Sequence, residues 1–278
     1  MLKPVTPVRL PVVAAAAIGL LLSSCGKSDE PAAPPAPGPA HPVDTGPGVP
    51  PLNPALDRRA LLSAVARAAS NYAAGVRVTE ADPLVGRQFD IRLAFGCEGP
   101  QVSGAEGGGL GRWSWSDDHQ SIQLSLTPGD WTRSALIAGA GQDQWEAVEG
   151  FWVARPWTDA EGCPTVGGDP LASGPATPSP QTVGLAAVFK AGGSRISRRN
   201  GRAYVHTIRK AGDAPLIPLN AGYRVRLQGR VATFPNGQAI RCRAASPDQR
   251  PVCVAAVQLD RVAFETAAGE TLSEWRPA

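Results

Sequence analysis

Apolar residues between Asp57 and Gly75 recur at the spacing of one helix face. Asp57 is suited to cap the first turn of a helix, and Gly75 is suited to end one. The pattern therefore predicts an amphipathic helix between these two residues. Its apolar face consists of Leu61, Leu62, Val65, Ala66, Ala69 and Tyr72.

From residue 88 onward the spacing of apolar residues changes to two. Apolar and polar side chains alternate through 88–95 and 121–127, which is typical of antiparallel strands that bury one face. Shorter apolar runs predict further strands at 112–116, 150–155 and 185–190.

The alternation is clearest in the last part of the chain. Residues 223–231 alternate strictly and are followed by Asn236-Gly237, a dipeptide that strongly favours a hairpin turn. We expect 238–243 to fold back on that strand, and 252–259 and 262–266 to form another pair. Gly229 lies within the first of these strands, where a bulge would fit.

A long strand broken by a glycine and followed by a hairpin resembles the start of an oligonucleotide/oligosaccharide-binding barrel. This resemblance covers about forty residues and implies a small barrel, and a sandwich is equally compatible with the pattern. We therefore expect a mainly β fold, with an N-terminal amphipathic helix followed by antiparallel sheets in a sandwich or small barrel. The pattern is also compatible with a division into two subdomains.

The first 24 residues have the three regions of an export signal. Lys3 and Arg9 give a positive start, residues 12–22 are apolar, and small residues follow. The sequence Leu22-Ser23-Ser24-Cys25 resembles the lipobox of bacterial lipoprotein precursors. An uncleaved anchor is the alternative, but the apolar run is shorter than the ~20 residues that span a membrane.

The lipoprotein resemblance implies that signal peptidase II cleaves before Cys25, which then carries a diacylglyceryl group and an acyl chain such as palmitate. Two or more chains hold a protein firmly on a bilayer. Position 26 is Gly rather than Asp, which in this family is associated with the outer membrane. We therefore expect a lipid-anchored protein of the cell envelope, on the periplasmic side of the outer membrane.

Composition divides the rest of the chain. Residues 25–54 are rich in Pro, Ala and Gly and predict an extended, disordered linker. We expect a helix and a Trp-rich β subdomain at 55–170, a linker at 171–181, and a basic antiparallel β subdomain at 182–278. Residues 25–180 hold 10 basic and 18 acidic residues, whereas 181–278 hold 15 and 6. The two halves could attract each other, or one could bind an anionic partner.

Four cysteines remain once Cys25 is lipidated, and disulfides are expected in an oxidising compartment. Of the three possible pairings we favour Cys97–Cys163 and Cys242–Cys253, because they place one disulfide in each half and the second closes a short loop. No metal site is predicted, because the sequence has no C-x-x-C pair and no paired histidines at ligand spacing. No cofactor is predicted either.

Motifs for catalysis are absent from the sequence, which has neither a G-x-S-x-G nucleophile turn nor a phosphate-binding G-x-G-x-x-G loop. No catalytic residue is therefore assigned. Six of the seven tryptophans lie between residues 113 and 157, among acidic residues. Trp113 and Trp115 can be core residues or a sugar-binding surface. The acidic residues that could act on a glycan are Asp117, Asp118, Glu146 and Glu149.

A cluster of arginines surrounds Asn200-Gly201. Guanidinium groups bind phosphate and carboxylate in pairs of hydrogen bonds, so lipopolysaccharide, cell-wall carboxylates or the acidic half of the chain are candidate partners. A solvated turn is the alternative interpretation. The cluster consists of Arg195, Arg198, Arg199 and Arg202.

These patterns predict a membrane-anchored envelope lipoprotein that acts as a structural or binding module facing the periplasm. Its expected partners are the membrane, through the anchor, and cell-wall glycan, lipopolysaccharide or another envelope protein. Nucleic acid is not expected outside the cytoplasm. The alternative function is a cell-wall or polysaccharide hydrolase, or a glycan-binding protein, that uses the Trp-rich acidic segment.

Overall fold

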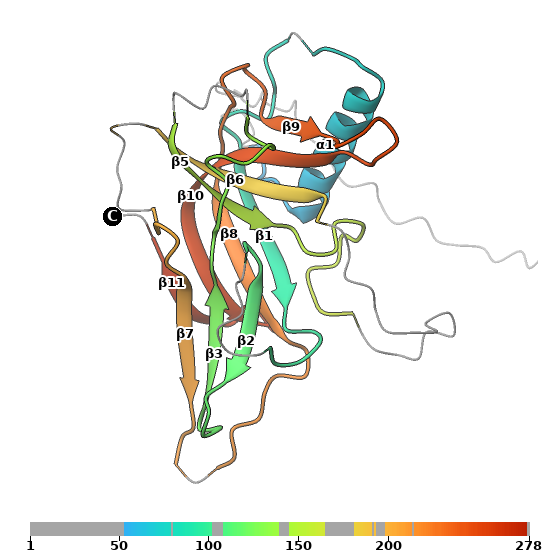
Figure 1. The fold of residues 1–278 in the computed structure, drawn as a ribbon. Helices are drawn as coiled ribbons and strands as arrows, with labels where there is room; N and C mark the ends of the chain where they lie inside the picture. Colours follow the sequence, from blue (N-terminus) through green and yellow to red (C-terminus); the bar gives the residue numbers. More distant parts are fainter. Residues whose placement is uncertain are drawn as a thin grey trace, which may run out of the picture. The chain divides into compact units, whose positions relative to one another are not determined.

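One helix and eleven strands are present in the described part of the chain (Figure 1). The computed structural model describes residues 53–276 except 79, 102–107, 139–144, 165–180, 191, 193–197 and 213. Cys25, Arg195 and the Pro-rich segment up to residue 52 lie outside these residues. The elements are α1 (Arg58–Ala73), β1 (Gln88–Phe95), β2 (Gly111–Trp115), β3 (Ser121–Leu126), β4 (Gly129–Asp130), β5 (Trp145–Trp152), β6 (Val183–Lys190), β7 (Tyr204–Arg209), β8 (Tyr223–Val231), β9 (Ile240–Arg243), β10 (Val252–Thr266) and β11 (Thr271–Trp275).

The predicted helix is confirmed as α1. The Ala60 N–H donates to Oδ1 of Asp57 at 2.8 Å, so Asp57 is the N-cap. Leu61 and Val65 are buried in the main apolar core. The helix ends before Gly75, whose φ of 66° is strained for residues with a side chain.

The larger sheet has the strand order β1-β8-β10-β6-β5-β4, and β9 and β11 also pair with β10. The β6–β10 pair is parallel and the other pairs are antiparallel. Strands from before and after the predicted linker at 171–181 are therefore joined in one sheet. That linker lies outside the described residues except for residue 181.

Residues 252–266 form one strand rather than the predicted pair. The pairing of β10 with β8 shifts between Leu259 and Arg261, which marks a bulge at Asp260. Gly229 on β8 approaches the backbone of Gln258 so closely that a Cβ atom would overlap it. A bulge is therefore present opposite Gly229, but its extra residue lies on β10 and not on β8, where it was predicted. The predicted break after residue 259 is wrong, because a bulge bends a strand without ending it.

The turn at Asn236-Gly237 is present, but its flanking strands do not pair with each other. The Phe234 N–H donates to the Gln238 carbonyl at 2.8 Å, which closes a short loop. Both β8 and β9 pair antiparallel with β10, so β9 continues in the direction of β8. The predicted hairpin is therefore wrong. Phe234 is fully buried, and its burial holds this loop against the sheet.

A second sheet, with the order β2-β3-β7, lies in front of the lower part of the larger one in Figure 1. The ring of Trp113 on β2 is 6.3 Å from that of Tyr223 on β8, and the ring of Tyr204 on β7 is 5.2 Å from that of Trp275 on β11. The two sheets thus share one apolar core. The fold is mainly β and sandwich-like, and its described strands form no closed barrel.

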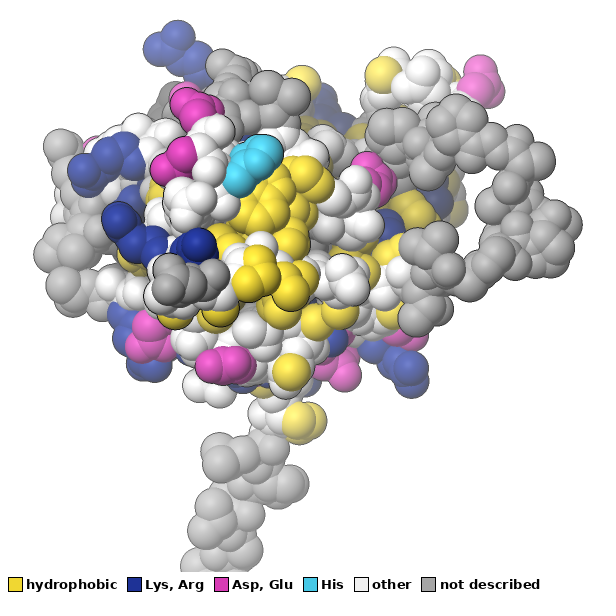
Figure 2. Space-filling model, turned by 90° about the horizontal axis from the view of Figure 1, so that it is seen from below, with side chains coloured by type: hydrophobic (Ala, Val, Ile, Leu, Met, Phe, Trp, Pro, Cys, Tyr) yellow, Lys and Arg dark blue, Asp and Glu magenta, His cyan; other side chains and the backbone are white. Residues whose placement is uncertain are grey.

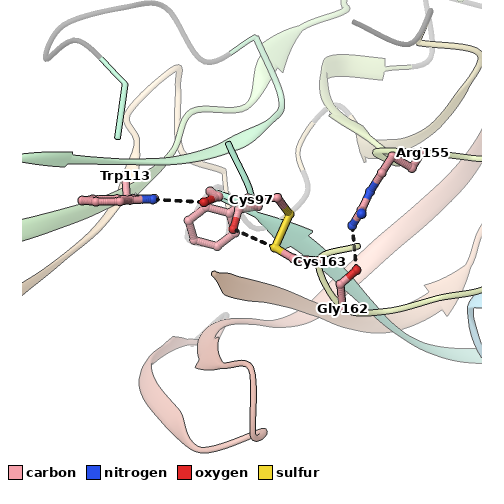
Figure 3. The surroundings of a disulfide bond; sticks show 7 residues. Cys97, Trp113, Arg155, Gly162 and Cys163 are labelled. Atoms are coloured by element: carbon pink, nitrogen blue, oxygen red, sulfur yellow. Dashed lines mark hydrogen bonds between the residues drawn. A yellow bond between two sulfur atoms is a disulfide. The ribbon is translucent and has the colours of Figure 1, made fainter. Parts of the chain in front are cut away.

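Both predicted disulfides are present. Cys97–Cys163 joins the end of β1 to the segment that follows β5, and Cys242–Cys253 joins directly opposite residues of β9 and β10. Figure 3 shows the first of them beside the Trp113 indole, whose Nε1 donates to the carbonyl of Gly96 at 3.4 Å. The favoured pairing is confirmed.

Arg58, in the first turn of α1, fastens the segment after β5 to the helix. This side chain is only 3% exposed. Its guanidinium donates to the carbonyls of Ala154, Arg155 and Thr158 at 2.7, 2.8 and 3.0 Å. Arg155 in turn donates to the carbonyl of Gly162 at 2.8 Å (Figure 3). These bonds join the segment to α1 and satisfy the buried guanidinium of Arg58.

A charged network crosses β1, β8 and β10 on the face opposite the shared core. Glu265 is 0% exposed and accepts from Arg92 at 3.0 Å and Arg226 at 3.3 Å. Arg226 also binds both carboxylate oxygens of Asp90, at 2.8 and 2.5 Å. Burial alone would raise the pKa of Asp90, but the hydrogen bonds and charge of Arg226 outweigh it and lower that pKa.

Candidate functional site

A pocket of about 200 Å³ opens beside β4 and β5, at one edge of the larger sheet. Three segments that are distant in sequence form it: the β4 region, the middle of β5 and the turn before β7. Its lining residues are Pro128, Gly129, Asp130, Thr132, Ala147, Val148, Glu149, Arg198, Asn200 and Gly201.

Glu149 is the central polar group of this pocket. The residue is 5% exposed and lies in β5 between Val148, which is buried, and Gly150. Its Oε1 accepts from the backbone N–H groups of Arg199 and Asn200 at 2.8 and 2.9 Å. Its Oε2 is buried and has no hydrogen-bond partner within the described part of the protein. Half of this carboxylate is therefore satisfied and half is not.

The turn before β7 is shaped to bind a carboxylate. Asn200 and Gly201 both have positive φ, 52° and 76°, which lets the preceding N–H groups point to one side. Consecutive backbone N–H groups in such a turn form an anion-binding concavity. The arginine-rich turn predicted from the sequence thus binds a carboxylate of the acidic half of this same chain.

The arginines of the turn have different roles. Arg198 pairs with Glu146 at 3.0 Å, and its Nε is buried without a hydrogen-bond partner among the described residues. Arg199 donates to the carbonyl of Ala203 at 2.7 Å, and its guanidinium lies 4.8 Å from the ring centre of Tyr204. Arg202 is exposed. Among the described arginines of this turn, only Arg198 lines the pocket.

Asp130 faces Glu149 across the sheet. The two residues are directly opposite in the antiparallel β4–β5 pair, which places their Cβ atoms about 4.5–5.5 Å apart on one face. Hydrogen bonds from Thr132 lower the pKa of Asp130, whereas burial raises that of Glu149 against the opposing effect of its two N–H donors. The pocket thus holds two carboxyl groups whose pKa values are shifted in opposite directions.

Three of the six clustered tryptophans are buried core residues. Trp113, Trp131 and Trp145 are 4%, 7% and 7% exposed, so they form no open aromatic surface. Trp115 is half-buried, and its ring lies 5.4 Å from that of His119. Trp157 is exposed, at 61%. Of the two interpretations of Trp113, the core interpretation matches its position.

An apolar group of side chains gathers on the face seen from below (Figure 2). The loop between β7 and β8 lies at this end of the molecule in Figure 1 and carries Ile217, which is 72% exposed, and Leu219, which is 41% exposed. This surface is separate from the residues that line the β4–β5 pocket.

The other acidic candidates do not line the pocket. Asp117 and Asp118 are exposed in the turn between β2 and β3, where Asp118 accepts from Ser116 and Gln120 and so shapes the turn. Within the described ranges, no three metal-ligating side chains come together to form a metal site. Among the described residues, no helix is long and apolar enough to cross a bilayer.

Glu149 and the arginine turn were each predicted from the sequence as candidates, but the contact between them was not predicted. A glutamate on the same strand face as Ala147 and Phe151 was the available signal, since both neighbours are buried. Asp130 and Thr132 had no such signal, because β4 has only two residues.

Comparison with known proteins gave no further assignment. No protein-family model matches this chain, and neither a curated protein nor a solved structure matches it.

Proposed function

We propose that this protein is a lipid-anchored component of the cell envelope, whose β fold acts as a binding module on the periplasmic side of the outer membrane. The signal-like first 24 residues, Cys25 and the Pro-rich segment support the anchoring. The observation that carries the binding role is the buried, unpartnered Oε2 of Glu149 in the β4–β5 pocket. A buried polar atom without a partner costs free energy unless a ligand satisfies it.

The anchoring is tested by metabolic labelling with radioactive palmitate. The full chain should incorporate label and sediment with membranes, and a Cys25→Ser variant should do neither. Label retained in the variant would contradict attachment at Cys25, and an unlabelled full chain would contradict the lipoprotein assignment.

The binding role is tested with the full chain in detergent micelles and purified cell-wall fragments. A binding module should show a raised melting temperature or a change in tryptophan fluorescence without releasing products. Bovine serum albumin treated in parallel controls for unspecific adsorption. No change in either property at saturating fragment concentration would contradict this role.

A glycan hydrolase is the second candidate, and the opposed carboxyl groups of Asp130 and Glu149 favour it. Retaining glycosidases hold two carboxyl groups about 5–5.5 Å apart, one protonated and one ionised. Such an enzyme would release reducing sugars from cell-wall glycan, and Glu149→Gln or Asp130→Asn would lower the rate by about 10²–10⁴-fold. Asp118→Asn is the matched control, and equal loss in it would contradict a role of the pocket.

A further inference from the structure

We infer that the β4–β5 pocket binds a neutral group that presents a hydrogen-bond donor beside an acceptor, and specifically the acetamido group of an N-acetylated sugar. This inference rests on the proposed binding role and names the ligand class of the same pocket. It follows from three properties of the lining residues: their unpaired polar atoms, their charges and their apolar surface.

The unpaired polar atoms of the pocket are one acceptor and one donor. Oε2 of Glu149 can accept a hydrogen bond, and Nε of Arg198 can donate one, and neither has a partner among the described residues. Both side chains line the same pocket. A secondary amide offers the complementary pair, because its N–H would donate to Oε2 and its carbonyl would accept from Nε.

The charges of the lining are mixed, so an ion of either sign meets at least one like charge. Glu149 and Asp130 would repel an anion, and Arg198 would repel a cation. The Glu149 carboxyl group is also buried, so an ion would have to lose its own bound water before it could contact that group. A neutral ligand avoids both costs and still satisfies the two unpaired atoms.

The apolar surface and the volume of the pocket match a small substituent of a sugar ring. Pro128, Ala147 and Val148 contribute to the lining, so a methyl group next to the amide carbonyl would find apolar neighbours. A volume of 200 Å³ holds about six groups of the size of water, at ~30 Å³ each. The pocket therefore accepts the acetamido group and the adjoining edge of one ring. No aromatic ring is among its lining residues, so affinity should be weak.

The test is a titration of the full chain in micelles, with the Ala147 methyl group observed by NMR. Ala147 lines the pocket, and the methyl groups of Val85, exposed just before β1 at the sheet edge opposite β4, serve as a remote reference. The ligands are N-acetylglucosamine and glucosamine, which carries an ammonium group in place of the acetamide. At concentrations on the order of 10 mM, N-acetylglucosamine should shift the Ala147 signal and leave Val85 unchanged.

Three variants locate the contact. Glu149→Gln keeps an acceptor for the two N–H groups of the turn but replaces Oε2 with a donor, so affinity should fall at least tenfold. Arg198→Met removes the donor and should have a similar effect. Arg202→Met alters an exposed arginine of the same turn and should leave affinity unchanged. Arg198→Met also keeps the test valid if Glu149→Gln fails to fold.

The inference is overturned if glucosamine shifts Ala147 as strongly as N-acetylglucosamine, if neither sugar shifts it, or if both pocket variants bind like the unaltered chain. These outcomes differ from failure of the proposed function. A chain that binds cell-wall fragments without a shift at Ala147 keeps its binding role and loses this ligand assignment. A chain that is not labelled at Cys25 loses its anchor, whatever the pocket binds.

Discussion

Arg226 should be the most costly charged residue to replace in the network across β1, β8 and β10. Arg226→Met removes two hydrogen bonds to Asp90 and one to Glu265, and methionine fills a similar length with apolar atoms. Breaking a buried ion pair costs about 3–5 kcal/mol. Asp90 is 25% exposed and Glu265 keeps Arg92, so we expect about 2–3 kcal/mol here.

Urea denaturation of the oxidised protein at pH 7 measures this loss, and melting should shift down by about 5–10 °C. Arg230→Met is the matched control on the same strand. Its side chain and that of its partner Asp260 are 61% and 50% exposed, so it should lose no more than about 0.5 kcal/mol. In a double-mutant cycle, Arg226→Met and Asp90→Asn should couple by at least about 1 kcal/mol.

The deficit of Arg226→Met should also depend on pH. The pKa of Asp90 is lowered in the folded protein, so its pairing stabilises the fold above the unfolded pKa and is lost as pH falls through the folded one. The difference between the variant and the unaltered chain should therefore shrink below about pH 4. Equal losses in Arg226→Met and Arg230→Met at pH 7, or additive effects in the cycle, would refute this reasoning.

Other variants test single features of the fold by the same urea assay. Asp57→Ala should cost about 1 kcal/mol and Asp57→Ser much less, because serine can still cap α1. Gly229→Ala should cost more than about 2 kcal/mol, because its Cβ meets the backbone of β10. Gly162→Ala is the control and should cost only a few tenths, because its φ is not positive and its Cβ would meet only Arg224 Nη2, at 3.5 Å. Replacing Cys242 and Cys253 with Ala should cost about 3 kcal/mol. In the unaltered protein, unfolded under oxidising conditions, thiol titration should find no free thiol among Cys97, Cys163, Cys242 and Cys253. Glu149 has a raised pKa, so its ionisation weakens the fold as pH rises from its unfolded value of ~4.3 through the folded one. Glu149→Gln should lack this decline in stability above about pH 4.

Local signals in the sequence predicted much of the fold. The cap at Asp57 and the helical spacing after it gave α1, and strict alternation gave β1, β3 and β8. The disulfide pairing followed from sequence distance and charge, and the structure has the same pairing. The helix and these strands depend on residues that are near one another in sequence. The disulfides required a choice among only three possible pairings.

Pairing between distant strands could not be predicted in the same way. Asp260-Arg261 has the composition of a turn, but it forms a bulge because Gly229 on another strand makes room for it. Asn236-Gly237 does form a turn, yet β10 provides a common partner for the strands on both sides. The pocket likewise needs β4, β5 and the Arg198–Gly201 turn together, and no local pattern links them.

The order of strands in the larger sheet also affects how the chain can fold. β1, near the start of the fold, has β8 as its sheet neighbour, and their Asp90 and Arg226 are 136 residues apart in sequence. Contacts between such distant residues form slowly, because a long loop must close first. A chain delivered from its N-terminus cannot complete this sheet until β8 and β10 have emerged. It therefore remains open until β8 and β10 are available, which would suit the export before folding that we propose.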